Sequence, residues 1–198
     1  MLIKNKTGSV VTLVINRPQV MNAMSSDLAE ALLTEIENTS AIKGIRSIVI
    51  TGSGGKAFCA GTDLKERITL SADEKWKQSR RLFALNEVIW NCPLPVIAAI
   101  DGWCLGGGFE LALYCDIRVG TFSSTFGWPE MTLGAYPGGG GAVILPRLIG
   151  IPKAKYLFYT AQRIHGQEAY DLGILEKVVE SNYLINVVNE ITSNIEKT

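Results

Sequence analysis

The sequence contains very little histidine, the residue that many metal sites and catalytic triads require. Among its 198 residues the only histidine is His165, which stands in a polar stretch directly after Arg163 and Ile164. One histidine argues against a histidine-based metal centre and against serine–histidine catalysis, so we expect no bound metal. We interpret His165 as a surface or capping residue.

Cysteine is also scarce, and its pattern does not indicate a disulfide framework. No Cys-x-x-Cys pair occurs among the four cysteines, which all have apolar neighbours: Cys59, Cys92, Cys104 and Cys115. Residues 1–6 lack the apolar segment and the cleavage site of a signal peptide. We therefore expect free buried thiols and a cytoplasmic protein.

The chain has no excess of either charge and no long apolar run. Its 19 basic and 19 acidic residues give a formal net charge of zero, and no long basic run is present. Apolar stretches such as 96–100 are too short to span a bilayer. We therefore expect neither a nucleic-acid nor a membrane partner. The length predicts a single domain, residues 1–198, with a substantial core.

Segments typical of strands and of helices alternate along the chain. Buried, often β-branched runs predict strands at 10–15, 45–50, 96–100 and 117–119. Apolar residues at helical spacing and capping residues predict helices that begin after residues 25–27 and that cover 73–90, 107–114, 142–149, 152–160 and 183–195. This alternation indicates an α/β fold.

Glycine is concentrated in one part of the chain, since eleven of the 20 glycines lie between Gly102 and Gly141. Gly106–Gly108 stand where a predicted strand meets a predicted helix, and exposed N–H groups at such a junction can hold an anion. A dinucleotide phosphate is one candidate, but Leu111 occupies the place of the third glycine of that fingerprint. A carbonyl oxygen that becomes negative in a transition state is the other candidate. Close packing of helix on strand explains the glycines equally well.

Two glutamates follow turns with apolar neighbours. Glu110 follows the three glycines and leads into Leu-Ala-Leu, whereas Glu130 follows Trp128 and Pro129. Loss of solvation raises the pKa of a carboxyl group toward the range useful for proton transfer. The ordinary alternatives are helix-dipole stabilisation for Glu110 and a solvated or capping role for Glu130. Together the pair predicts an enzyme that handles an anion made from a carbonyl compound.

A second glycine-containing turn occupies residues 58–64, and Asp63 is placed to cap the helix that follows it. Alone, this turn is typical of an ordinary loop between a strand and a helix. Together with the turn at 105–108 it could supply two converging N–H donors. Loss of one such donor typically costs about 3 kcal/mol of transition-state stabilisation.

These segments resemble the enoyl-CoA hydratase/isomerase (crotonase) superfamily. The matches include Asn-Arg-Pro at 16–18, Leu-Gly-Gly-Gly-Phe-Glu at 105–110 and Phe-Gly-Trp-Pro-Glu at 126–130. Further matches in family order are 22–23, 57–64, 95–102, 111–112, 115–117 and 133–141. The resemblance implies a crotonase-like spiral of ββα units that binds an acyl-CoA thioester. It also implies further helices after residue 198, so we expect the C-terminal helical part to be shortened.

The resemblance also implies roles for single residues. Thr62 and Gly107 match the two positions whose backbone N–H groups form the oxyanion hole. Glu110 and Glu130 match the two catalytic carboxylates of the hydratases, and Gly138 matches a glycine that helps to orient water.

Binding of coenzyme A (CoA) is implied for residues of the second turn. The segment that matches the CoA-contacting loop contributes Ala60, Thr62, Asp63, Leu64 and Lys65. Lys56, Lys65 and Arg67 are candidates for contacts with its phosphates. No cofactor is implied beyond the CoA of the substrate, and the family resemblance implies a homo-oligomer, a trimer or a hexamer. Trp128 and Tyr136 are bulky for positions around the water site, and their bulk is expected to narrow the acyl pocket or to favour a different reaction.

The leading hypothesis for function is hydration of a 2-enoyl-CoA or the reverse dehydration. Double-bond isomerisation, decarboxylation, and dehydration of a carrier-protein thioester are alternatives that use the same enolate chemistry. A non-catalytic acyl-CoA-binding protein is the alternative from a different class.

Overall fold

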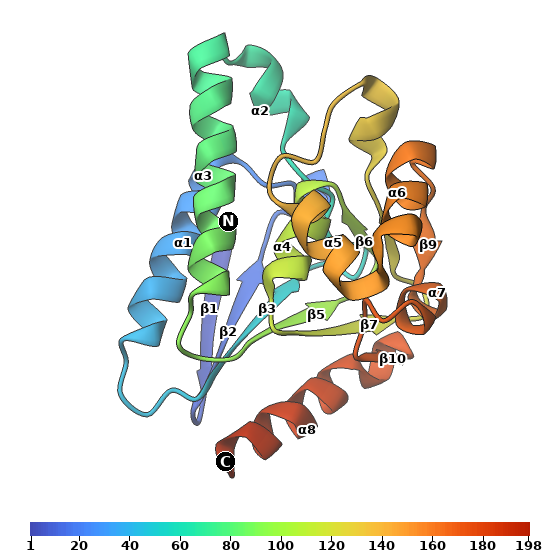
Figure 1. Ribbon diagram of the computed structural model, residues 1–198. Coiled ribbons are helices and arrows are strands. Elements are labelled where there is room, and N and C mark those ends of the chain that lie inside the picture. Colours follow the sequence, from blue (N-terminus) through green and yellow to red (C-terminus); the bar gives the residue numbers. More distant parts are fainter.

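The computed structural model describes all of residues 1–198 and contains two β-sheets with helices around them (Figure 1). The larger sheet has six strands, in the spatial order β1 (Leu2–Thr7), β2 (Val10–Ile15), β3 (Ser47–Gly52), β5 (Val96–Ile100), β7 (Ile117–Thr121) and β10 (Lys177–Val179). β1 and β2 pair antiparallel, and all other neighbours in this sheet pair parallel. β5 is buried along its whole length, which explains its continuous apolar run.

After each of three strands of the larger sheet, the chain continues into one short strand of the smaller sheet. Its order is β4 (Ala57–Cys59), β6 (Trp103–Leu105), β8 (Thr125–Gly127) and β9 (Ile164–His165). Each pair, β3–β4, β5–β6 and β7–β8, leads into a helical segment: α2 (Leu64–Thr69), α4 (Gly107–Tyr114) or the 3₁₀ segment η2 (Pro129–Leu133). These repeated strand–strand–helix units confirm the α/β spiral of ββα units.

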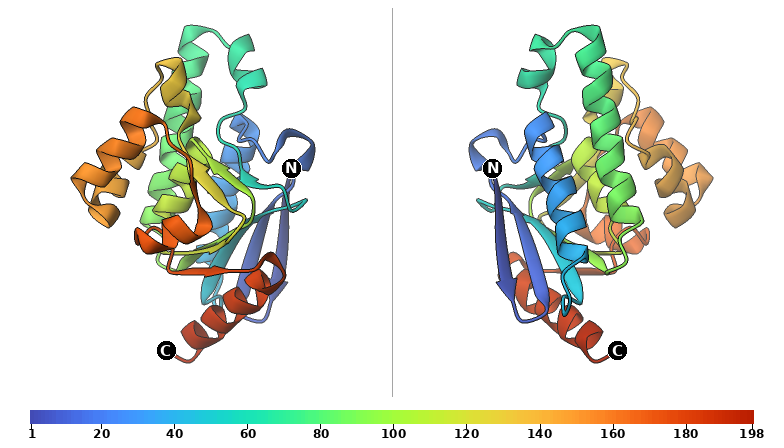
Figure 2. Two further views of the ribbon diagram at one scale, coloured as in Figure 1. Left: turned by 90° about the vertical axis from the view of Figure 1, so that its right-hand side faces the viewer. Right: turned by 90° about the vertical axis from the view of Figure 1, so that its left-hand side faces the viewer.

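Long helices cover both faces of the larger sheet. On one face, α1 (Ser26–Ser40) packs beside α3 (Ala72–Trp90), and both contribute buried leucine and isoleucine side chains to the main core. On the other face lies α8 (Leu184–Glu196) (Figure 2). Its Leu184 and Val188 pack in a smaller apolar cluster with side chains of β3, β5 and β7. The strands β3, β5 and β7 thus have helices packed on both faces, whereas β2 is fully buried only at alternate residues.

The remaining helices lie near the smaller sheet and its loops. α5 (Gly141–Ile149) contacts both α4 and α6 (Ile151–Thr160), and α7 (Gly166–Asp171) follows β9. Two further 3₁₀ segments are η1 (Pro18–Val20) and η3 (Ser181–Tyr183). None of the helices combines the length and apolar character needed to cross a bilayer.

Sequence patterns found the long elements and missed the short ones. The helices predicted at 73–90, 107–114, 142–149 and 152–160 are confirmed to within one residue at each end. The strand predicted at 45–50 begins two residues later, at Ser47. β1 was missed because its polar residues are mostly exposed, and β4, β6 and β8 were missed because three residues are too few to show a periodic pattern. All four cysteines are free, and only Cys92 is not buried.

Candidate active site

The three glycines between β6 and α4 serve different purposes. Gly106, with φ of +50° and ψ of −125°, is the N-cap of α4 and has a backbone conformation that side-chain-bearing residues rarely adopt. A Cβ atom at Gly108 would lie 2.2 Å from the carbonyl oxygen of Cys59, so Gly108 allows α4 to pack on β4. At Gly107 a Cβ atom would meet only Thr62, at the ordinary contact distances of 3.5 Å to its Oγ1 and 3.8 Å to its amide nitrogen. The same turn therefore combines close packing at Gly108 with an accessible backbone amide at Gly107.

The bend between β4 and α2 is held by its neighbours on both sides. Gly61 has φ of +97°, and its carbonyl accepts a hydrogen bond from the Met24 amide at 2.8 Å. The carboxylate of Asp63 accepts hydrogen bonds from the amides of Lys65 and Glu66 and forms an ion pair with Arg17 at 2.9 Å. The predicted capping role of Asp63 is confirmed, and the Arg17 partner explains why this buried acid keeps its pKa below the usual value despite burial.

The two bends meet at their exposed amides. A Cβ atom at Gly107 would lie 3.8 Å from the amide nitrogen of Thr62, and a Cβ atom at Gly61 would lie 3.4 Å from the amide nitrogen of Gly107. Neither the Thr62 nor the Gly107 amide donates a hydrogen bond to a protein atom. Two unused N–H donors from distant parts of the sequence are therefore neighbours.

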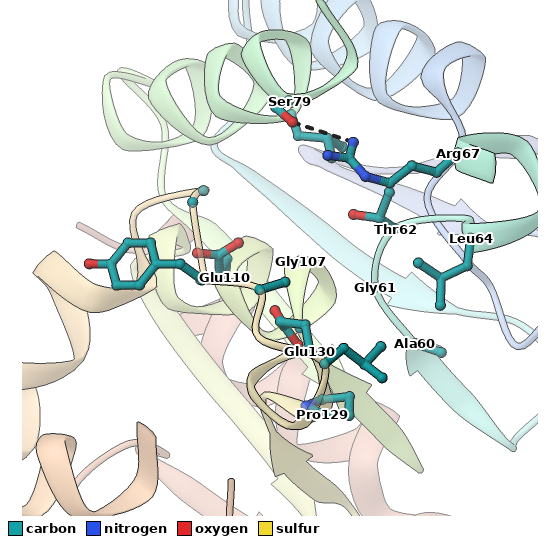
Figure 3. Close-up of a pocket in the computed structure, with 17 residues that line it drawn as sticks. Ala60, Gly61, Thr62, Leu64, Arg67, Ser79, Gly107, Glu110, Pro129 and Glu130 are labelled. Carbon is teal, nitrogen blue, oxygen red and sulfur yellow. Dashed lines mark hydrogen bonds between the residues drawn. The ribbon is translucent and has the colours of Figure 1, made fainter. Parts of the chain in front are cut away.

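Both amides line a cavity of about 290 Å³ bordered by α2, α3, α4 and residues 129–139 (Figure 3). The cavity wall includes these site residues predicted from the sequence: Ala60, Thr62, Leu64, Gly107, Glu110, Glu130 and Gly138. Asp63 and Lys65 are not on this wall, because Asp63 is engaged with Arg17 and Lys65 is exposed on α2. Arg67, one of the phosphate candidates, lines the cavity.

Glu110 lies one turn into α4 and is 5% exposed. Its Oε1 accepts a hydrogen bond from the amide of Gly141 at 2.9 Å. Burial is the main cause that raises the pKa of Glu110 to about 7, and the charge of Glu130 adds to this, whereas the Gly141 amide opposes it. A carboxyl group with this pKa can accept or donate a proton at neutral pH.

Glu130 belongs to η2 and is only partly buried. Burial raises the pKa of its carboxyl group as well. A Cβ atom at Gly106 would lie 2.9 Å from Oε2 of Glu130, so the absence of a side chain at Gly106 leaves room for this carboxylate. The turn before α4 thus accommodates one glutamate and leads directly to the other.

The loop before α5 encloses Glu110. A Cβ atom at Gly139 would lie 2.4 Å from Oε2 of Glu110, so only glycine fits there without movement. The side chain of Asn86, on α3 and 3% exposed, donates to the carbonyl of Gly139 at 2.9 Å. Sequence reasoning missed Asn86, although an amide side chain at the helical spacing of Leu82, Leu85 and Ile89 is a signal that could have found it.

The expectation that Trp128 narrows the acyl pocket is wrong. Trp128 is 1% exposed and packs in the core against Phe109 and Phe158, with ring centroids 4.4 and 4.6 Å away. It is not part of the cavity wall, whereas Tyr136 is. The two aromatic residues flank the same loop in sequence, but only tertiary packing decides which one reaches the core.

The ββα spiral, with two unused amides and two carboxylates around one cavity, defines an enzyme of the crotonase fold. The sequence matches the enoyl-CoA hydratase/isomerase family over residues 5–197. It is 40% identical over 200 residues to the short-chain-enoyl-CoA hydratase of Clostridium acetobutylicum, covering 98% of this chain and 74% of that protein. It is 38% identical over 198 residues to the crotonyl-CoA hydratase of Syntrophomonas wolfei, and the match covers 98% of this chain and 75% of that protein.

The likeness extends to solved structures. A crystal structure of enoyl-CoA hydratase from Bacillus anthracis, 39% identical, superposes with a TM-score of 0.97 and is matched over 100% of this chain and 77% of that one. The chain belongs to the enoyl-CoA hydratase/isomerase family, and it is an enzyme of that type. The alternative of a non-catalytic acyl-CoA-binding protein is therefore set aside.

Proposed function

We propose that this enzyme adds water to the double bond of a 2-enoyl-CoA thioester and catalyses the reverse dehydration. The observation that carries the proposal is that two carboxylates, Glu110 and Glu130, line the same cavity as two unused amides. Hydration needs a group that takes a proton from water and a second group that delivers one to carbon. The two relatives described above are named as hydratases, which supports the same reaction here.

In this proposal the amides of Thr62 and Gly107 donate to the thioester oxygen. Negative charge grows on that oxygen as water adds to the β-carbon, so donors fixed in advance lower the barrier, by about 3 kcal/mol for each donor. Backbone atoms supply both hydrogen bonds, so the identity of the side chain at Thr62 is not critical.

Glu110 is proposed to take the proton from water. Its carboxylate is fixed by the Gly141 amide and enclosed by the loop that contains Gly138 and Gly139, so a water held by the Gly138 amide would lie beside it. Oxygen then bonds to the β-carbon, the double-bond electrons move toward the α-carbon and the carbonyl oxygen, and Glu130 delivers a proton to the α-carbon. Both acids return to their starting states by proton exchange.

Binding of CoA is proposed for the second bend. Ala60, Thr62 and Leu64 line the cavity and are available to contact the pantetheine arm. Lys65 is exposed on α2 and would meet the phosphates, whereas Asp63 would act indirectly by holding the bend through Arg17. No cofactor is proposed beyond the CoA of the substrate itself.

A homo-oligomer, a trimer or a hexamer, is proposed for the assembled enzyme. Exposed apolar side chains on α5 and α6, among them Val143, Ile151, Tyr156 and Tyr159, support this proposal. Sedimentation of the purified protein measures the assembly. A cytoplasmic location is also proposed, because CoA thioesters are made and used inside cells, and cell fractionation tests it.

The experiment is incubation with crotonyl-CoA in water labelled with heavy oxygen, followed by mass spectrometry of the thioester. We expect a product heavier by one labelled water, and we expect the Glu110→Gln variant to form almost none. A product of unchanged mass with a shifted double bond would assign isomerisation instead. Loss of carbon dioxide from a carboxylated thioester, without uptake of label, would assign decarboxylation.

A further inference from the structure

Arg67 is the only cationic side chain on the wall of the catalytic cavity. The other residues of the wall are glycines, apolar or hydroxyl-bearing residues and the two acids Glu110 and Glu130. Arg67 comes from α2 and lies with Ser79 of α3 on the wall across the cavity from the two acids (Figure 3). The cavity thus has acids on one side and a guanidinium group on another.

No carboxylate of the protein neutralises this guanidinium group. The protein has four ion pairs, and the arginines in them are Arg17, Arg81 and Arg118. Glu66, the acid adjacent to Arg67 in sequence, is already engaged, because its carboxylate accepts hydrogen bonds from the Ser26 amide at 3.0 and 3.2 Å. A partly buried cation without an acidic partner is a favourable site for a ligand group of opposite charge.

The guanidinium group is held in place and still has free donors. Nη1 of Arg67 donates to Oε1 of Gln78 at 2.8 Å and, at 3.4 Å, to the Ser79 hydroxyl and the Lys75 carbonyl. Gln78 is 2% exposed, and its own amide donates to Glu66 at 3.1 Å, which fixes its orientation. Nε and Nη2 of Arg67 donate to no protein atom, so an oriented edge of the guanidinium group remains available.

We propose that the acyl group of the substrate carries a carboxylate and that Arg67 binds it. This inference rests on the proposed function, because the thioester oxygen at Thr62 and Gly107 fixes where the acyl chain begins. A guanidinium group pairs with a carboxylate through parallel, charge-assisted hydrogen bonds. Arg67 would also offset the repulsion that Glu110 and Glu130 exert on a negatively charged acyl chain.

A phosphate of CoA could in principle supply the same negative charge. Thr62, Gly107 and Arg67 all line one cavity of about 290 Å³, so a group bound at Arg67 would share this cavity with the thioester. The whole pantetheine arm separates the thioester from the CoA phosphates. The compactness of the cavity therefore favours an acyl carboxylate.

The kinetic test compares two five-carbon substrates, the 1-CoA thioester of pent-2-enedioic acid and neutral pent-2-enoyl-CoA. In Arg67→Met we expect kcat/KM for the charged substrate to fall by about 10- to 100-fold, because a hydrogen bond to a charged group is lost. For the neutral substrate we expect a change of less than about threefold. Arg67→Lys should restore part of the difference. Lys77→Met, which removes an exposed cation from α3, should change neither value.

A binding experiment without turnover separates this inference from the proposed reaction. Calorimetry measures the Kd of pentanedioyl-CoA, pentanoyl-CoA and free CoA, and we expect Arg67→Met to weaken only the first. Equal weakening of all three would assign Arg67 to a CoA phosphate and overturn the proposal. Equal affinity of the wild-type protein for the charged and the neutral thioester would overturn it too. A charge preference in a protein that hydrates neither enoyl substrate would support the carboxylate site and contradict the hydratase proposal.

Discussion

Glu110 and Glu130 lie in one cavity but are held in different ways. Glu110 belongs to α4, a helix buried almost throughout, and its carboxylate accepts a hydrogen bond from the Gly141 amide. Glu130 belongs to a 3₁₀ segment, is partly exposed, and accepts no hydrogen bond from another residue. In sequence both glutamates follow a turn with apolar neighbours. Their different environments come from the elements that pack around each turn.

The difference is that another residue holds the carboxylate of Glu110 by a hydrogen bond and none holds that of Glu130. Asn86 holds the Gly139 carbonyl, and the loop of Gly139 and Gly141 in turn encloses Glu110. The carboxylate of Glu130 lies beside Gly106 and accepts no hydrogen bond from another residue. A fixed, desolvated carboxyl group suits the orientation of water, and a less constrained one suits proton delivery to carbon.

The largest predicted effect concerns turnover. Replacing either acid by its amide keeps the shape and removes proton transfer, so Glu110→Gln and Glu130→Gln should each lower kcat by about 10²- to 10⁴-fold. The affinity for a saturated thioester such as butyryl-CoA should change little. Steady-state kinetics and calorimetry measure the two quantities. If either variant loses affinity as strongly as turnover, that glutamate binds the thioester and the role proposed for it is wrong.

A smaller predicted effect concerns how stability depends on pH, and it should be larger for Glu110 than for Glu130. Burial raises the pKa of Glu110 from 4.5 to about 7 in the folded protein. The folded protein is therefore more stable when this carboxyl group is protonated than when it is charged. That contribution is fully present below pH 4.5 and is lost as the pH rises through 7, a difference of about 3 kcal/mol in the free energy of unfolding.

Urea unfolding across that pH range measures this loss. Glu110→Gln should remove most of it, so the variant should gain stability relative to the wild-type protein as the pH rises. Glu130→Gln should remove less, because its carboxyl group is more exposed. An identical pH dependence in the wild-type protein and Glu110→Gln would show that burial does not perturb this acid, and the contrast between the two glutamates would disappear.

The main framework of the fold could be predicted from the sequence, because long buried strands and capped helices leave strong local patterns. Ser71, for example, forms a reciprocal cap with Glu74 where α3 begins. The smaller sheet could not be predicted, because its strands have only two or three residues and depend on pairing across the spiral. The single-domain organisation stays a prediction.

At the site, the sequence identified the turns and the acids but not the residues that position them. Glu110 and Gly107 are recognisable because glycines and an acid adjoin in an apolar segment. Asn86 donates a hydrogen bond to Gly139, which lies 53 residues later in the chain, and no local sequence pattern predicts such a contact. Arg67 was considered only for phosphate, because its proximity to Gln78 and to the cavity emerges only when α2 packs beside α3.

The most direct measurement is a crystal structure of the protein with butyryl-CoA, a thioester that has no double bond to hydrate. We predict that the thioester oxygen lies within hydrogen-bonding distance of the Thr62 and Gly107 amide nitrogens. The carboxylates of Glu110 and Glu130 should then face the β- and α-carbons. A thioester oxygen bound away from either amide, or an acyl chain that turns away from the two acids, would contradict the account.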